Sequence, residues 1–251
     1  MLTDPLFLTM IIAAVTLLGL AKGGFAGVGM VATPMMALVI PPLQAAAIFL
    51  PILLVQDVIS VWVYRRDWDA WNLKVMMPGS VIGIVVAWVM AAHLSDAMVR
   101  LAVGLIGLAF VLNAWFGKVS VEPQTPKAAA GIFWGSISGF TSTLVQAGSP
   151  PFQVFTLPQR LPKLVFVGTN AVFFAATNAL KVIPYFALGQ FSTETIHISL
   201  WMLPLAIATN FLGIWLVRVT PTILFYRIAY VLVFLISIGL TWNALQAMFF
   251  S

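Results

Sequence analysis

The feature that most constrains this chain is a series of long apolar stretches, along which uncharged runs of 18 or more residues recur. A hydrocarbon core about 30 Å thick is crossed by a helix of ~20 apolar residues, so these stretches predict membrane-spanning helices. Eight stretches follow one another along the 251 residues: 6–40, 43–64, 73–92, 97–116, 128–158, 164–186, 196–217 and 222–245. The sequence therefore predicts an all-α polytopic membrane protein.

Composition excludes several other classes of protein. Hydrophobic residues make up 62% of the chain and charged residues 8%, whereas soluble domains carry about 25% charged residues. This composition excludes three classes of protein: soluble enzymes, nucleic-acid binders and secreted disulfide scaffolds. The chain has no cysteine, and its two histidines, His93 and His197, lie far apart, so we expect no metal or other cofactor.

Two of the stretches are too long for one straight span. Residues 6–40 would form a helix of roughly 52 Å, and residues 128–158 are nearly as long. The first contains four glycines between Ala21 and Gly29, and the second contains Gly139 to Thr143 and then Ala147 to Pro151. Because glycine and proline break helices, each stretch is predicted to form two helical pieces around a kinked centre.

The order of one broken stretch followed by three clean spans occurs twice, which predicts repeats at 1–120 and 121–251 within a single membrane domain. The residues that align between the halves are Pro34 with Pro150, Pro42 with Pro162, Pro78 with Pro204, and Arg100 with Arg227. Duplicated halves with interrupted helices are typical of secondary transporters, whose binding site lies at the interruptions.

Charge placement favours hairpins at the broken stretches. If each one returns to its own side, one membrane face carries nine cations and the opposite face only Arg100. The nine are Arg65, Arg66, Lys74, Lys118, Lys127, Arg160, Lys163, Arg218 and Arg227. This bias predicts inverted repeats with both termini in the periplasm, although re-entrant and short crossing pairs both stay open. Trp62, Tyr64, Trp68 and Trp71 flank one cytoplasmic loop as an interfacial aromatic belt would.

Three ionisable side chains are expected to be buried within apolar stretches, where a charge at the bilayer centre costs at least ~2.5–3.5 kcal/mol. Lys22 is either an anion-attracting charge beside half-helix N-termini or a snorkelling lysine. Asp57 is a proton or cation coupling site, the structural partner of a lysine, or both. Lys181, one helical turn after Asn178, either attracts the substrate or reaches the interface near Pro184.

Uncharged polar residues gather at the second broken stretch. They are Thr141, Ser142, Thr143, Gln146 and Ser149, and Thr169 and Asn170 open the next span. Hydroxyls, amides and free N–H groups suit a small oxyanion, and helix packing by small polar residues is the alternative. An intramembrane protease is not expected, because no Ser–His pair or second buried aspartate is present.

Several of these segments resemble motifs of the sulfite exporter TauE/SafE family. They are Lys22 to Gly29, Val31 to Pro34, Gly139 to Thr143, Gln146 to Pro151, Leu157 to Lys163, Gly168 to Asn170, and Asn178 to Lys181 with Pro184 and Tyr185. The resemblance covers essentially the whole chain. It departs at Ser149, where Ala-Gly-Ser-Pro-Pro replaces the more typical Gly-Gly-Pro-Pro, so Ser149 either tunes the ligand or replaces a turn glycine.

The resemblance implies an integral protein of the bacterial inner membrane that moves small sulfur-containing anions such as sulfite, sulfoacetate or another organosulfonate. We expect a secondary transporter that works by alternating access, with its site at the two broken helices. An uncoupled anion channel or facilitator and a carrier of a non-sulfur carboxylate are the alternatives. The predicted substrate-binding residues are Lys22, Gly23, Gly24, Gly27, Thr141, Ser142, Gln146, Ser149, Thr169, Asn170, Asn178 and Lys181, with Asp57 as coupling candidate. The lipid bilayer and a small anion are the expected partners, nucleic acid is not, and the coupling ion and oligomeric state stay open.

Overall fold

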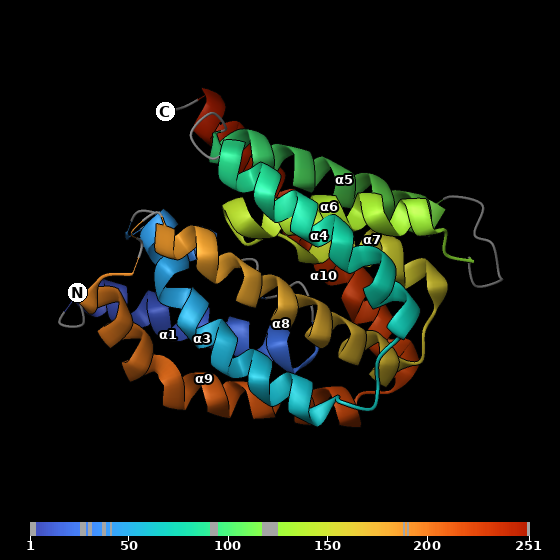
Figure 1. The fold of residues 1–251 in the computed structure, drawn as a ribbon, viewed down its shortest axis with the longest axis horizontal. Coiled ribbons are helices and arrows are strands. Elements are labelled where there is room, and N and C mark those ends of the chain that lie inside the picture. Colours follow the sequence, from blue (N-terminus) through green and yellow to red (C-terminus); the bar gives the residue numbers. More distant parts are fainter. Residues whose placement is uncertain are drawn as a thin grey trace. The chain divides into compact units, whose positions relative to one another are not determined.

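The computed structural model describes residues 4–25, 29, 32–36, 39–40, 42–90, 95–116, 125–187, 189 and 191–249, and this part of the chain contains helices and no strand (Figure 1). The helices are α1 (Pro5–Gly23), α2 (Ala32–Met36), α3 (Pro42–Val63), α4 (Ala70–Met90), α5 (Asp96–Phe116), α6 (Ala128–Val145), α7 (Ser149–Thr156), the short 3₁₀ helix η2 (Leu157–Gln159), α8 (Lys163–Ala187), α9 (Thr193–Val219) and α10 (Thr222–Phe249). Six described helical segments are long and apolar enough to cross a membrane, in α1, α3, α4, α8, α9 and α10. The predicted all-α polytopic membrane fold is confirmed.

Both long stretches are broken, as predicted. The first stretch leaves the helix after α1 at Gly24, whose φ of 137° disfavours any residue with a side chain, and α2 then packs back against α1. The second leaves the helix after α6 at Gln146, with a left-handed φ of 55°, and α7 packs back against α6. A helix that returns along its predecessor is what a hairpin requires.

The position of the second break differs from the prediction. Gly139 to Thr143 is helical and forms the end of α6, so the break is confined to the residues between Val145 and Ser149. Gly139 serves packing instead, because a Cβ there would lie 2.3 Å from the carbonyl oxygen of Ser80 on α4. The glycine was therefore misread as a helix breaker.

The helices form two compact units. Unit 1 comprises Met1–Trp68 and Val167–Pro221, and unit 2 comprises Asp69–Phe166 and Thr222–Ser251. Unit 1 thus contains α1, α2, α3, α9 and most of α8, whereas unit 2 contains α4 to α7, η2 and α10. Each unit takes helices from both predicted halves, so the compact units are not the predicted repeats.

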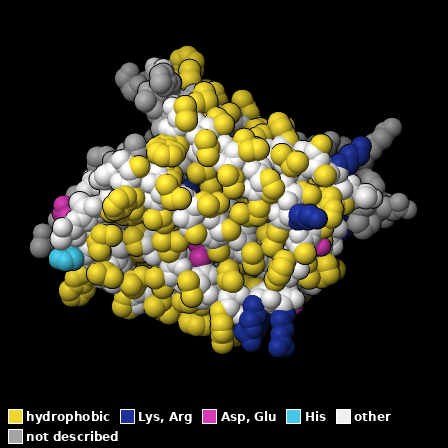
Figure 2. Space-filling model, viewed as in Figure 1, with side chains coloured by type: hydrophobic (Ala, Val, Ile, Leu, Met, Phe, Trp, Pro, Cys, Tyr) yellow, Lys and Arg dark blue, Asp and Glu magenta, His cyan; other side chains and the backbone are white. Residues whose placement is uncertain are grey.

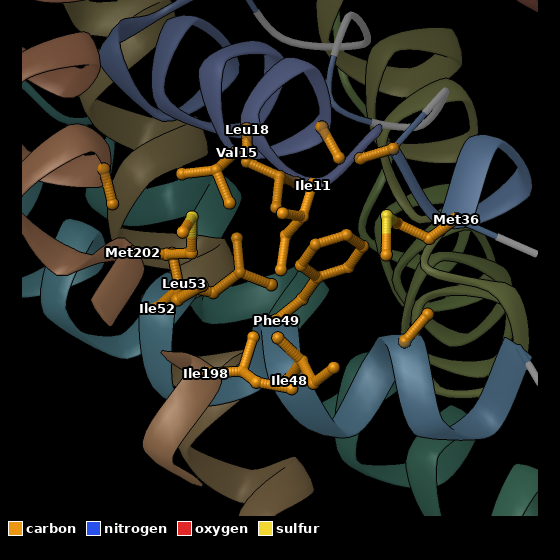
Figure 3. Packing of buried hydrophobic residues seen from close by; sticks show 14 of the residues in the cluster. Ile11, Val15, Leu18, Met36, Ile48, Phe49, Ile52, Leu53, Ile198 and Met202 are labelled. Carbon is orange, nitrogen blue, oxygen red and sulfur yellow. The ribbon is translucent and has the colours of Figure 1, made fainter. Parts of the chain in front are cut away.

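The core of unit 1 is built by apolar faces of four helices. Figure 3 shows Ile11 and Val15 of α1 facing Phe49 of α3, with Met36 of α2 and Ile198 of α9 closing the cluster. All five side chains are buried. This packing joins the middle of α1 to α3, on the helix that ends at the first break.

Close backbone contacts join helices of opposite halves. In unit 1, α1 packs on α9, and a Cβ on Gly23 would lie 2.5 Å from the backbone of Gly213. In unit 2, α6 packs on α4, and a Cβ on Gly83 would lie 2.0 Å from the carbonyl oxygen of Ser136. The first helix of each half therefore packs on the middle span of the other half. This reciprocal packing is what we expect of a chain built from two similar halves. The inverted orientation of the repeats stays a prediction.

Hydrophobic side chains cover the visible face of the protein, where Lys and Arg are few (Figure 2). Trp62, Trp68 and Trp71 are exposed, as residues of an interfacial belt would be. Tyr64 is only 1% exposed, so its assignment to that belt was wrong.

Candidate functional site

The centre of the candidate site in unit 1 is an ion pair between Lys22 and Asp57. Lys22 lies in the last turn of α1, and its ammonium donates to Oδ1 of Asp57 on α3. The side-chain amide of Asn178, on α8, donates to the other carboxylate oxygen at 2.7 Å. Both oxygens of Asp57 are thus engaged by donors, and Asp57 is the partner of a lysine, while its coupling role stays a prediction.

The ammonium of Lys22 is partly accessible and has few partners. Its side chain is 11% exposed while that of Asp57 is 3% exposed, so the ammonium is the more accessible member of the pair. Its Nζ lies 5.8 Å from the ring centre of Phe174, within range of a cation–π contact. Among the described residues Asp57 is its one hydrogen-bond acceptor, and an ammonium has three N–H groups. Two of its N–H groups therefore have no acceptor among the described residues.

Lys22 lies at the carbonyl end of α1, where the helix dipole favours a cation on the protein. The half-helix N-termini expected beside it stay a prediction, because residues 26–28 and 30–31, which lead into α2, lie outside the described residues.

The hydroxyls of Ser60 on α3 and of Tyr64, the residue that follows α3, bind the backbone carbonyls that the break leaves without helical partners. Ser60 Oγ donates to the carbonyl of Lys22 at 2.9 Å, and the hydroxyl of Tyr64 donates to the carbonyl of Gly23 at 2.7 Å. Burial raises the pKa of Tyr64, an effect that the charge of Arg218 partly opposes, so this hydroxyl stays a donor at neutral pH. These contacts fix the end of α1 and with it the stem of Lys22.

A polar network extends from these hydroxyls to α9. Ser60 lies 3.2 Å from Oδ1 of Asn210, the amide of Asn210 donates to the carbonyl of Gln56, and the amide of Gln56 donates to the carbonyl of Ala206. None of these residues was predicted. Gln56, Ser60 and Tyr64 follow one another at a spacing of four, which puts them on one face of a helix, and this spacing is the signal that could have found them.

The remaining predicted residues of unit 1 lie along α8. Lys181 is fully buried, one turn beyond Asn178, and interacts electrostatically with both Lys22 and Asp57. Thr169 is buried as well, as is Asn170, whose Oδ1 has no hydrogen-bond partner among the described residues. Gly23 and Gly24 form the break itself, whereas Gly27 lies outside the described residues. The structure brings Lys22, Asp57, Asn178 and Lys181 into one cluster, which we call the α1 charge cluster.

Predicted residues of the second break lie in unit 2, where hydroxyls fix the turn between α6 and α7. Thr141 Oγ1 lies 2.8 Å from the carbonyl of Ile137 and 3.0 Å from that of Ala147, and Ser138 donates to the carbonyl of Gly148 at 2.8 Å. For Thr141 these contacts match the structural alternative. Ser142 is buried near the end of α6, and Gln146 is the left-handed residue that follows this helix.

Ser149 is the first residue of α7 and is followed by Pro150 and Pro151. Because proline has no N–H, the start of this helix offers fewer backbone donors to an anion than an ordinary helix start. An anion here would depend more on hydroxyl donors such as that of Ser149.

Comparison with known proteins identified one matching family. The family model described as "Sulfite exporter TauE/SafE" matches residues 11–240, which is most of the chain. No curated protein and no solved structure gave a significant match.

Proposed function

The chain belongs to the sulfite exporter TauE/SafE family, and we propose that it is a secondary transporter of small sulfur-containing anions in the bacterial inner membrane. The substrate class we propose is sulfite, sulfoacetate or another organosulfonate. The six membrane-spanning candidates support a multi-pass protein, and family membership supports transport of a sulfur anion.

The observation that carries this proposal is the incomplete coordination of Lys22. Its ammonium lies at a helix break within an apolar unit, is partly accessible, and has one hydrogen-bond acceptor among the described residues. A sulfonate or sulfite oxygen supplies the acceptor that such an ammonium lacks, and charge-assisted hydrogen bonds of this kind are the strong ones. We therefore assign Lys22 as the main contact to the anion, with Lys181 adding positive potential behind it.

The broken helices support alternating access as the transport mechanism. In secondary transporters, discontinuous helices of the two repeats hold the substrate while one repeat or helix bundle rocks against the other. Here α1 and α6 end at breaks, and each packs on the middle span of the other half. Coupling to protons or to another ion belongs to the same proposal, with the α1 charge cluster as its place.

Binding is tested first, with purified protein in detergent and a panel of sulfite, thiosulfate, sulfoacetate, taurine and simple carboxylates. We expect ligand-dependent stabilisation by the sulfur oxyanions, because a ligand that binds only the folded state raises its stability. Stabilisation by carboxylates alone would contradict the proposed substrate class and favour a carrier of a non-sulfur carboxylate.

Counterflow in proteoliposomes then separates a carrier from a channel. A carrier loaded with unlabelled substrate should take up labelled substrate transiently against its gradient, whereas an uncoupled channel or facilitator should only equilibrate it. Absence of counterflow with retained anion flux would contradict alternating access.

A further inference from the structure

We propose that Asp57 sets the charge of the anion that the α1 charge cluster accepts, so that this site prefers monoanions to dianions. The inference rests on the proposed function, because it concerns the same site. It identifies the substrate class further by its charge, a property that sulfur oxyanions of nearly equal size do not share.

The charges in the cluster carry the argument. Asp57 is the only acidic side chain that is buried among the described residues; it pairs with Lys22 and interacts electrostatically with Lys181, both in its own unit. When both lysines are protonated, they and the one aspartate leave one formal positive charge. In a medium of low dielectric constant a site tends toward electrical neutrality, because each uncompensated unit charge within about 5 Å costs several-fold more than it does in water. A bound anion with one negative charge brings the net charge of the cluster to zero, whereas an anion with two charges makes it negative.

The position of Asp57 makes this charge a fixed part of the site. Asn178 donates to one carboxylate oxygen and Lys22 to the other, so the carboxylate cannot turn away without losing a buried hydrogen bond. The less exposed member of the pair is the carboxylate, and an anion approaches the more accessible ammonium. The anion therefore approaches an ammonium group whose positive charge is already neutralised by the less exposed carboxylate of Asp57.

The consequence for substrate choice is direct. A monoanionic sulfonate binds with its single charge matched, using the two remaining N–H groups of Lys22. A dianion such as sulfate, or sulfoacetate among the proposed substrates, brings one unmatched negative charge next to the Asp57 carboxylate and therefore binds more weakly than a monoanion.

The test compares methanesulfonate with sulfate near neutral pH, since the two are nearly equal in size and carry one and two charges. Dissociation constants are measured on purified protein in detergent by calorimetry, for the wild type and for Asp57→Asn. Asparagine keeps the shape of aspartate and raises the formal charge of the cluster by one. We expect the wild type to bind methanesulfonate more tightly, and D57N to shift the ratio of dissociation constants toward sulfate by about tenfold or more.

Control variants separate charge from structure. Glu194→Gln removes one exposed negative charge of the same unit and should leave the ratio unchanged. The double variant K22M/D57N restores one net positive charge, so its ratio should return close to that of the wild type even though both anions bind more weakly. If D57N does not fold, Lys181→Met replaces it, because it lowers the cluster charge by one and should shift the ratio about tenfold away from sulfate.

The outcomes distinguish the two proposals. If neither anion binds the wild type, the proposed function is contradicted at the level of small sulfur oxyanions. If both anions bind and the ratio is the same in D57N or K181M as in the wild type, only the role of Asp57 in charge selection is overturned.

Discussion

At the scale of single residues, the Lys22–Asp57 pair explains how two charged side chains lie within apolar helices. Each charge alone would carry a large desolvation penalty, and the pair with Asn178 offsets it by direct hydrogen bonds. Removing one partner of such a pair is much more damaging than removing both. This asymmetry separates the structural role of Lys22 from its proposed role in binding.

Lys22→Ala should weaken binding of sulfur oxyanions by about tenfold to a hundredfold, because a charge-assisted hydrogen bond contributes about 1.5–3 kcal/mol. It should also destabilise the protein by about 3 kcal/mol, since Asp57 would remain buried without its cation. Thermal unfolding and calorimetric titration measure the two effects.

The double variant K22A/D57N should recover most of this stability but not the binding, and Lys74→Ala, which removes an exposed lysine, should change neither. Wild-type affinity in K22A would return Lys22 to the role of a snorkelling lysine.

Tyr64→Phe should destabilise the protein by about 1–3 kcal/mol, because it leaves the carbonyl of Gly23 without its donor. The effect depends on pH. Burial raises the pKa of Tyr64 above the usual 10.0, so the unfolded chain loses the phenolic proton at lower pH than the folded one does. The stabilisation is therefore complete below pH 10.0 and is lost as the pH rises above it. Unfolding followed as a function of pH should show this alkaline component in the wild type and not in Y64F.

The residues of the charge cluster were predictable one by one, but their pairing was not. The apolar sequence around Lys22, Asp57 and Lys181 was enough to single them out, because a charge within an apolar span is costly unless it is paired or functional. Which lysine binds Asp57 depends on how α1, α3 and α8 pack, and the sequence pattern carries no information on that. Tyr64 was misassigned for the same reason, since its place at the end of a span fits both an interface residue and a buried donor.

At the scale of helices, close packing in unit 2 depends on glycines that bring two backbones together. Gly79 and Gly83 of α4 face Gly135 and Gly139 of α6, and a Cβ at any of the four would lie within about 2.3 Å of a backbone oxygen of the other helix. Backbone atoms cannot move aside as a flexible side chain can. The contact therefore tolerates no larger residue.

Gly83→Ala should destabilise the protein by about 1–3 kcal/mol through overpacking. Gly239→Ala on α10 is the matched control, because a Cβ there meets nothing within 4 Å and alanine favours a helix by about 1 kcal/mol. Melting temperatures in detergent compare the two variants, and equal destabilisation by both would contradict the packing argument.

Helix positions followed from the sequence closely. The span predicted at 43–64 is α3 at Pro42–Val63, and the span predicted at 164–186 is α8 at Lys163–Ala187. The length of each apolar stretch and the charged or turn-forming residues at its ends determine these bounds. The end of α6 was predicted less well, because a glycine that breaks a helix and a glycine that admits a neighbouring helix look alike in sequence.

At the scale of the whole molecule, the asymmetric distribution of Lys and Arg predicts the membrane orientation. Both termini should lie in the periplasm and the loop from Arg65 to Lys74 in the cytoplasm. Fusions of a reporter after Ser251 and within that loop test this, using an enzyme active only outside and a fluorophore that matures only inside. A C-terminal reporter that works only in the cytoplasm would contradict the hairpin interpretation of the broken stretches.

The interleaving of the two units also has a consequence for biosynthesis. Helices α1 to α3 leave the ribosome long before α8 and α9, so unit 1 is incomplete while unit 2 is still being translated. Lys22 and Asp57 are 35 residues apart, whereas Asp57 and Asn178 are 121 apart, so the ion pair can form well before the amide arrives. During insertion, therefore, the nascent chain can neutralise its two early charges without help from the second half. A first half synthesised alone should enter the bilayer with this pair already made, and should become a stable unit only when the second half is co-expressed with it.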